Sequence, residues 1–496
     1  MGLAQLTIRN ARVLDGSGGP AVEADVEVRE GRIHQVGRAG DAREEIDARG
    51  DVLAPGFVDT HTHDDGALLG HPGMEFKLAQ GCTSVVIGNC GFSAAPNLPG
   101  GSGAPGSGGL FPGMETDWTD LAGYFRAVER VRPAVNAVAL VGHNTLRSLV
   151  LGNEKREPSE SELATMRGHV EQSLEQGACG FSTGLIYRPG RYSTTEEVAA
   201  LAAPLGAHGA LYATHMRNEA DRLLEAVEET LEIGRRADCA VHISHHKAAG
   251  RANWGKVRDS LARVDRAVAE GQDVTLDVYP YTAGSGPMIE YFDLDRVDQE
   301  LAALVQLASC PPFPQFEGRR IPEIAEELGL SIADTMRKIL TAPRGEATIC
   351  IHFTMDEADV EENLRHARVM VGSDGIPDLS GRPHPRLFGT MPRVLGHYVR
   401  ERGVLPLEEA VRRMTRLSCE RFGLVGRGRI EAGYWADLVL FDPERVIDRA
   451  TYEDPKQEPD GIGAVVVNGE VAYRDGRHTG AGAGRLLRYR RDDASV

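Results

Sequence analysis

Two histidines separated by one residue, His61 and His63, stand in the stretch Ala-Pro-Gly-Phe-Val-Asp-Thr-His-Thr-His-Asp-Asp that runs from 54 to 65. Pro55–Gly56 interrupts two short apolar runs, so we expect a sharp turn and then a strand. Side chains alternate between the two faces of a strand, so both imidazoles point the same way. Such a pair can hold one divalent metal ion. An isolated His-x-His equally fits two ordinary polar histidines, so the interpretation depends on further ligands.

Three further residues with metal-binding side chains follow apolar runs that resemble strands: Cys90, His215 and Asp374. A cysteine at a strand end is often a small buried residue, but a thiolate beside a dication is stabilised, and Zn²⁺ accepts sulfur as well as imidazole. An aspartate after a buried strand is often only a helix N-cap. Since each residue ends a strand, where barrel enzymes place their active sites, the series favours a metal centre.

The run His-Ile-Ser-His-His-Lys from 242 to 247 offers three histidines. His242 lies early in its predicted strand, which favours a structural role. His245 has the same parity as Val241 and Ile243, the inward face if those two residues line a barrel. His246 points the other way, so we favour His245 over His246 as the ligand.

Strand-like apolar runs alternate with helical segments such as 223–235 and 261–269, the pattern of a parallel sheet with crossover helices. Together with the strand before His61 there are nine strand candidates for the eight places of a barrel, so one is wrong or lies in an insertion. Residues 285–345 hold short helices and a Pro-rich turn, and we expect an insertion near the barrel mouth there. The Gly/Ser/Pro-rich segment 96–112 predicts a long mobile loop. The other eight candidates are Ser84–Ile87, Asn136–Val141, Gly180–Ser182, Leu211–Ala213, Val241–Ile243, Asp273–Val278, Thr348–Ile351 and Val369–Val371.

Short alternating strands are predicted at both chain ends. Leu6–Ile8, 24–29 and 33–36 are separated by turns rich in Gly and Asp, and 464–468 with 470–474 predict a hairpin around Asn468–Gly469. We interpret residues 1–55 plus 420–496 as one small β-sandwich domain and 56–419 as the barrel. Two unrelated terminal flaps are the alternative.

Length and composition agree with this α/β organisation. A chain of 496 residues suits a barrel with insertions plus a smaller domain. A formal charge of −18 argues against nucleic acid or an anionic membrane as a partner, and no apolar run is long enough for a membrane span. Seven scattered cysteines and the lack of a signal peptide predict a cytoplasmic location, and an oligomer is possible.

The order His-x-His, Cys, His, His, Asp resembles the amidohydrolase superfamily of metal-dependent (β/α)8-barrel hydrolases. Longer motifs narrow the resemblance to the D-aminoacylase family, the N-acyl-D-amino-acid deacylases, over about residues 50–390. One departure is Thr282–Pro287, where that family leads us to expect a Ser-Thr pair. The motifs are Asn-Cys-Gly-Phe-Ser at 89–93, Val-Gly-His-Asn-Thr-Leu-Arg at 141–147, Ser-Thr-Gly-Leu-Ile-Tyr-Arg-Pro-Gly at 182–190, Thr-His-Met-Arg-Asn-Glu at 214–219, Ser-His-His-Lys at 244–247, Tyr-Pro-Tyr at 279–281 and His-Pro-Arg at 384–386.

The resemblance implies zinc-dependent hydrolysis of N-acyl-D-amino acids. A tighter zinc would be held by Cys90, His215 and His245, and a weaker second site would lie at His61, His63 and Asp374. Asp374 would also act as general base and acid. For the carboxylate of this small-molecule substrate, the candidates are Lys247, Tyr187, Tyr279, Tyr281, Ser285 and Arg386.

Two alternatives remain open. A cyclic-amide hydrolase of the hydantoinase or dihydroorotase type would carry a lysine that bridges two metals, whereas Cys90 with its neighbours Asn89 and Gly91 favours the deacylases. A non-catalytic barrel scaffold would bind partners through its surface, but such relatives lose ligands and every ligand position is filled here. The sequence does not define the D-amino-acid side chain that is accepted.

Overall fold

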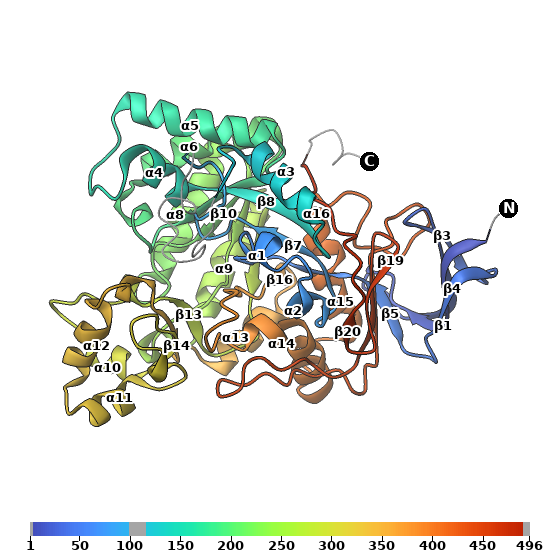
Figure 1. The fold of residues 1–496 in the computed structure, drawn as a ribbon. Coiled ribbons are helices and arrows are strands. Elements are labelled where there is room, and N and C mark those ends of the chain that lie inside the picture. The colour runs from blue at the N-terminus through green and yellow to red at the C-terminus, as the bar shows by residue number, and fades with distance from the viewer. Residues whose placement is uncertain (1–2, 99–115, 490–496) are drawn as a thin grey trace.

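The computed structural model describes residues 3–98 and 116–489 and has a barrel of parallel strands at its centre (Figure 1). The strands pair in chain order, and the ends of the first and last are joined by a parallel bridge between Thr62 and Gly375 and by a hydrogen bond from Asp374 N to His61 O of 2.8 Å. The expected (β/α)8 barrel of the amidohydrolase type is therefore confirmed. Its strands are β6 (Phe57–Asp59), β7 (Cys82–Ile87), β8 (Asn136–Gly142), β9 (Gly180–Gly184), β10 (Leu211–His215), β11 (Ala240–Ile243), β12 (Val274–Val278) and β16 (Val369–Val371).

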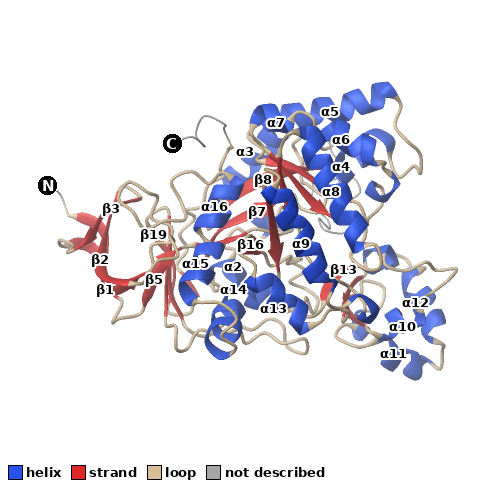
Figure 2. Cartoon of the chain, turned by 180° about the vertical axis from the view of Figure 1, so that it is seen from behind, coloured by secondary structure: helices blue, strands red, loops and turns tan. Residues whose placement is uncertain are grey.

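Helices cover the outside of the barrel (Figure 2). The predicted helices at 223–235 and 261–269 are α8 (Leu223–Ala237) and α9 (Lys256–Ala269), whose apolar spacing buries one face of each against the strands. No helix among the described residues is long and apolar enough to cross a bilayer. The other helices between the strands and after them are α1 (Ala67–Gly70), α2 (Glu75–Leu78), α3 (Leu121–Val131), α4 (His143–Leu151), α5 (Glu160–Glu175), α6 (Thr195–Ala202), α7 (Leu205–His208), α13 (Glu357–Arg365), α14 (Arg386–Arg393), the π-helix Val394–Glu401, α15 (Leu407–Met414) and α16 (Arg416–Phe422).

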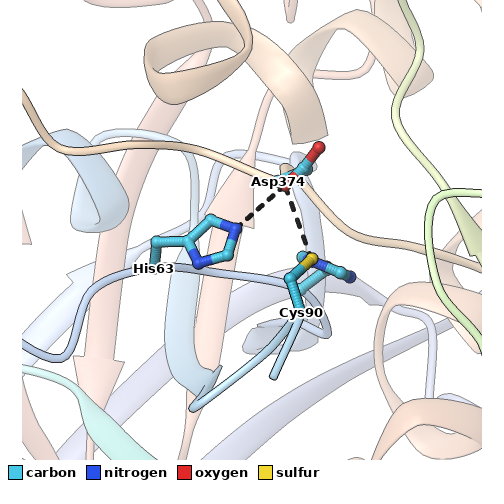
Figure 3. Close-up of side chains that lie close together, drawn as sticks. His63, Cys90 and Asp374 are labelled. Atoms are coloured by element: carbon cyan, nitrogen blue, oxygen red, sulfur yellow. Dashed lines mark hydrogen bonds and ion pairs between the residues drawn. The ribbon is translucent and has the colours of Figure 1, made fainter. Parts of the chain in front are cut away.

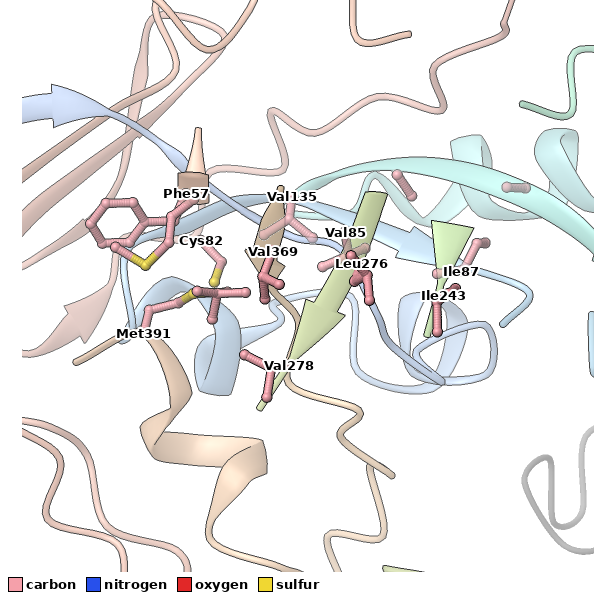
Figure 4. Close-up of a cluster of buried hydrophobic side chains, with 14 of the residues drawn as sticks. Phe57, Cys82, Val85, Ile87, Val135, Ile243, Leu276, Val278, Val369 and Met391 are labelled. Carbon is pink, nitrogen blue, oxygen red and sulfur yellow. The ribbon is translucent and has the colours of Figure 1, made fainter. Parts of the chain in front are cut away.

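Alternate residues of the barrel strands enter two different cores. Val58, Val86 and Met370 pack in the barrel interior, which Phe422 of α16 closes at the bottom. Their neighbours in sequence face the helices and join the larger core, part of which Figure 4 shows with Val85, Ile87, Ile243, Leu276 and Val369 among its members. Because the interior is filled by side chains, a substrate can approach only at the mouth, beyond the carboxyl ends of the strands.

The two chain ends form one small β-domain, as expected. β17 pairs antiparallel with β5, so strands from both ends share a nine-stranded sheet, and the predicted hairpin turns at Asn468–Gly469. Leu6, Val26, Leu438 and Val466 belong to a common core. The strands are β1 (Ala4–Val13), β2 (Val22–Arg29), β3 (Arg32–Gly37), β4 (Ala42–Asp47), β5 (Val52–Pro55), β17 (Leu438–Phe441), β18 (Ile462–Val467), β19 (Glu470–Arg474) and β20 (Arg477–His478).

A second group of elements interrupts the barrel between β12 and β16 and lies on the opposite side of the barrel from the terminal domain (Figure 1). The strand candidate Thr348–Ile351 is wrong as a barrel strand: it corresponds to β15, which pairs only with β13 and β14. Most of the predicted loop at 96–112 lies outside the described residues. The group comprises β13 (Gly284–Pro287), α10 (Gln299–Ala303), β14 (Val305–Ser309), α11 (Ile321–Leu328), α12 (Ile332–Leu340) and β15 (Ile349–His352).

Candidate metal centre

The structure brings all six predicted metal-binding residues together at the barrel mouth. Cys90 is central: its Sγ lies 3.2 Å from His61 Nε2, 3.7 Å from His215 Nδ1 and 3.4 Å from His245 Nε2. The ligand atoms of Cys90, His215 and His245 lie within 4.8 Å of one another. A tetrahedral zinc with bonds of about 2.0–2.3 Å separates its ligand atoms by about 3.5 Å, so this spacing fits one zinc ion.

A second group of potential ligands shares Cys90. His61, His63, Cys90 and Asp374 also place their ligand atoms within 4.8 Å of one another. Asp374 Oδ1 lies 3.2 Å from His63 Nε2 and 3.5 Å from His61 Nε2. Figure 3 shows His63 and Cys90 directed toward Asp374. The expected common orientation of His61 and His63 is therefore observed, although β6 ends before them, at Asp59.

Three of these residues have a left-handed backbone. Their φ angles are +52° at Cys90, +33° at His245 and +50° at Asp374. A non-glycine residue in this region costs about 1–3 kcal/mol and persists only where the surroundings enforce it. Each residue lies just beyond a strand, where the left-handed step turns the chain so that its side chain points across the barrel mouth. The left-handed backbone thus brings these three side chains together, and it lowers the stability of the fold.

The parity argument for His245 started from a wrong premise, although the structure does place His245 beside Cys90. Val241 and Ile243 face the helices, and His242 is the residue of β11 that points into the barrel, where its ring packs against Phe422. His245 reaches the mouth because the chain turns after Ile243. His246 points away, as expected, and is held by Asn363 and Ser260.

Sequence reasoning missed Glu219, which contacts both histidines of the Cys90 group. Its Oε1 lies 3.0 Å from His245 Nδ1 and its Oε2 3.3 Å from His215 Nε2, so each ring turns its other nitrogen toward Cys90. Oε1 also accepts a 2.6 Å hydrogen bond from Lys247 Nζ. Such outer carboxylates fix the orientation and tautomer of histidine ligands. The signal was available, since Glu219 follows His215 by four residues.

Asp277, at the end of β12, was also missed. One of its oxygens lies 3.3 Å from His61 Nδ1 and 2.7 Å from His242 Nε2, and the other accepts a 2.8 Å hydrogen bond from the His245 backbone N–H. This carboxylate therefore orients His61 and braces the turn at His245. Its pKa is lowered, because the favourable charge of His61 outweighs burial, which alone would raise it.

The buried anionic groups of the centre would be stabilised by a nearby positive charge. Burial would raise the pKa of the Cys90 thiol, but His61 and His245 lower it well below its ordinary value, so sulfur is present as thiolate. Burial would lower the pKa of His61, yet the anionic Cys90 and Asp277 raise it well above its ordinary value. A dication would supply the charge that these anions require. Zn²⁺ suits the sulfur and nitrogen donors.

Arg386, predicted to bind a carboxylate, is fully buried beside the centre. Its Nη1 lies 3.0 Å from Asp374 Oδ2 and its Nη2 donates to the carbonyl of Ser285 at 3.1 Å. The Nη1 contact lacks hydrogen-bond alignment, so Nη1 and Nε have no hydrogen-bond partner among the described residues. Its guanidinium also lies 4.6 Å from the ring centroid of Tyr279. Burial would raise the pKa of Asp374, but Arg386 and His245 lower it well below its ordinary value.

The remaining predicted substrate residues have different surroundings. The ring of Tyr187 packs edge-on against His215, with centroids 4.7 Å apart, and its hydroxyl lies 3.3 Å from that of Tyr291, a residue that sequence reasoning did not select. Lys247 is bound to Glu219 and lies 2.7 Å from His245 Nδ1. Tyr281 packs with Tyr279 and Met355, and its hydroxyl lies 3.5 Å from an oxygen of Asp448.

Comparison with known proteins agrees with this geometry. A model of the amidohydrolase family matches residues 44–315 and 315–473. The chain is 45% identical over 484 residues to a D-aminoacylase from Alcaligenes xylosoxydans xylosoxydans, covering 97% of each protein. It is 43% identical over 498 residues to an N-acyl-D-glutamate deacylase from the same organism, covering 99% of this chain and 97% of the relative.

A solved structure is similar over nearly the whole chain. It is an N-acyl-D-glutamate deacylase from Bordetella bronchiseptica in complex with zinc and a phosphonate inhibitor that mimics the tetrahedral intermediate. The TM-score is 0.92 at 39% identity, covering 98% of this chain and 100% of the other. Fold and site thus define a metal-dependent hydrolase of the amidohydrolase type. Within that class, the chain belongs to the D-aminoacylase family of N-acyl-D-amino-acid deacylases.

The contacts of Glu219 predict that it positions two zinc ligands. Glu219→Gln should reduce zinc affinity by about 10- to 100-fold, because the amide lacks the negative charge that faces both rings and Lys247. Zinc content after dialysis against a graded series of chelator concentrations measures this, with circular dichroism to verify folding. Cys90→Ala is the reference for loss of the tight site, and Glu229→Gln, whose carboxylate pairs with Arg217, is the matched control. Wild-type zinc retention in Glu219→Gln would contradict the assignment.

Proposed function

We propose that this protein uses zinc to hydrolyse the amide bond of N-acyl-D-amino acids, giving a carboxylate and a free D-amino acid. The observation that carries the proposal is the centre itself: a buried thiolate shared by two groups of imidazole ligands, with Arg386 beside it. Family membership and the zinc-bound deacylase structure support it.

In this proposal the tight zinc is held by Cys90, His215 and His245, and the weaker site comprises His61, His63 and Asp374 with the shared Cys90. Zinc, when bound, polarises the amide carbonyl and makes water a nucleophile near neutral pH. Asp374 is the general base. Its carboxylate accepts the proton as the water oxygen bonds to the carbonyl carbon, then donates that proton to the nitrogen as the C–N bond breaks. Its low pKa keeps it ionised at the start.

We assign recognition of the substrate carboxylate to Arg386 and Lys247, with Tyr279 and Tyr187 beside them. Arg386 contributes most, since its Nε and Nη1 have no hydrogen-bond partner among the described residues and its charge stays fixed beside the centre. The Lys247 ammonium lies at the barrel mouth and donates a hydrogen bond to Glu219. A carboxylate and a carbonyl held at two fixed points leave one direction for the side chain, which makes the enzyme stereospecific.

The alternatives have less support. A cyclic-amide hydrolase would place a bridging lysine where Cys90 lies, whereas the buried Lys77 is bound to Asp59 away from the ligands. A scaffold would not need three strained residues directed at one point. We further propose a cytoplasmic protein without a nucleic-acid or membrane partner, free to form oligomers. All seven cysteines are unpaired, which supports that location.

The central experiment is a panel of N-acetyl amino acids in both D and L forms, with zinc counted in the same sample. We expect hydrolysis of the D series with at least about 100-fold preference over the L series, since the L enantiomer must give up a charge-assisted contact. The zinc-loaded protein should be the active species. Efficient hydrolysis of L substrates, or a protein that purifies without zinc, would exclude the proposal.

Removing the general base should abolish turnover but not metal binding. Asp374→Asn is expected to lower kcat by about 10²–10⁴-fold while leaving the tight zinc largely in place, because the amide cannot carry the proton. The measurement is kcat together with zinc content. A decrease of less than about tenfold would exclude Asp374 as the base.

Substitution of Arg386 should lower the activity on free acids more than the activity on the corresponding methyl esters. Arg386→Met is expected to lower kcat/KM for N-acetyl-D-amino acids by about 10- to 150-fold more than for their methyl esters, because only the acid loses a charge-assisted contact. Lys247→Met should act in the same direction but less strongly, since Glu219 already shares its charge. Equal losses on acid and ester would assign carboxylate binding to other groups.

A further inference from the structure

Two relatives of equal identity, 43%, are named an N-acyl-D-glutamate and an N-acyl-D-aspartate deacylase, so overall identity does not define the side chain that this enzyme accepts. The distribution of charge around the centre addresses that question. A substrate of the N-acyl-D-glutamate type brings two carboxylates, and each needs a cationic partner once it leaves water.

Among the described residues at the mouth, Arg386 combines full burial with open donor atoms, although its Nη1 lies 3.0 Å from Asp374 Oδ2. Arg386 is 0% exposed, and its Nε and Nη1 have no hydrogen-bond partner among the described residues. One charged guanidinium can accompany a single substrate carboxylate. The α-carboxylate, which is present in every N-acyl amino acid, would use the donor atoms of Arg386.

Carboxylates of the protein already pair with the other cations nearby. Lys247 Nζ lies 2.6 Å from Glu219 Oε1. Arg188 Nε lies 3.0 Å from Glu290 Oε1, and Arg191 lies 3.6 Å from the other oxygen of Glu290. A second substrate carboxylate would have to displace Glu219 or Glu290. Residues 99–115, outside the described part, contain no lysine or arginine that could take its place.

The wall beside the centre is aromatic and uncharged. Tyr187 packs with Phe92 and Tyr291, and Tyr291 in turn packs with His352, whose ring centroid lies 4.8 Å away. A Cβ at Gly284 would meet the His352 ring, so this glycine makes room for it. Burial, then the charges of Lys247 and Arg386, lower the pKa of His352 to about 3, so it is neutral at pH 7.

On the basis of the deacylase activity proposed above, we infer that this enzyme accepts N-acyl-D-amino acids with uncharged, mainly apolar or aromatic side chains and discriminates against D-glutamate and D-aspartate. The groups described above are aromatic rings, carboxylates and cations paired with those carboxylates, so none of them offers an unpaired cation to a second substrate carboxylate.

The test compares substrates that differ only in charge. For wild-type zinc enzyme, kcat/KM for N-acetyl-D-glutamine should exceed that for the isosteric N-acetyl-D-glutamate by at least about 30-fold, the upper part of the range for an unpaired charge. N-acetyl-D-asparagine and N-acetyl-D-aspartate should differ in the same direction, and N-acetyl-D-methionine should be the best of the straight-chain series. Glutamate hydrolysed as well as glutamine would overturn the inference. It would leave the deacylase proposal intact, whereas a D series that is entirely inert would overturn both.

A variant examines the origin of the discrimination. Glu290→Gln removes the anion that pairs with Arg188 and should raise the glutamate-to-glutamine ratio of kcat/KM about three- to fivefold, as expected for release of a partly exposed ion pair. Glu229→Gln, which releases Arg217, should leave that ratio unchanged. An unchanged ratio in Glu290→Gln would exclude the Arg188–Glu290 pair as a determinant.

Discussion

The balance of charge in a buried space is the constraint on which the centre depends. The Cys90 thiolate and the carboxylates of Glu219, Asp277 and Asp374 are all held ionised although burial opposes it, which gives four negative charges. Arg386 and Lys247 return two positive charges, and one dication makes the group neutral if the histidines are neutral. The metal therefore completes an electrostatic arrangement that the protein has already organised, and the left-handed backbone at three ligands is part of the cost of that organisation.

The residues at the proposed metal centre and those proposed to contact the substrate side chain come largely from different parts of the fold. The ligands come from the ends of barrel strands, which the closed sheet and the filled interior hold rigidly. The wall that faces the substrate comes largely from the segment between β12 and β16, which supplies Tyr291 and His352. That segment has its own core around Met288, Phe316 and Met336, so its surface can change without disturbing the strands. Relatives with one metal chemistry and different substrates are a natural result.

Local sequence predicted the ligands because each follows a strand, and strand ends of a barrel meet at one rim. His61, His63, Cys90, His215, His245 and Asp374 all converge there. Parity along a strand was weaker evidence: it holds only up to the last residue of β11, and His245 lies past a left-handed turn that no periodicity reveals. Asp277 was missed because a carboxylate that orients a ligand has no spacing rule of its own, whereas Glu219 was missed although it follows His215 by four residues. Tyr281 was included on its motif, while packing directs its hydroxyl to Asp448.

The same charge balance supports the proposal that the two metal sites sharing Cys90 differ in strength. The first dication neutralises the group, and it enters next to the thiolate with two imidazoles whose other nitrogens face Glu219. A second dication adds two charges that no described anion compensates. Its carboxylate ligand, Asp374, already lies 3.0 Å from the Arg386 guanidinium, which repels a metal ion. This supports the proposal that the second site is the weaker one, since a metal bound there would compete with Arg386 for Asp374, the proposed general base.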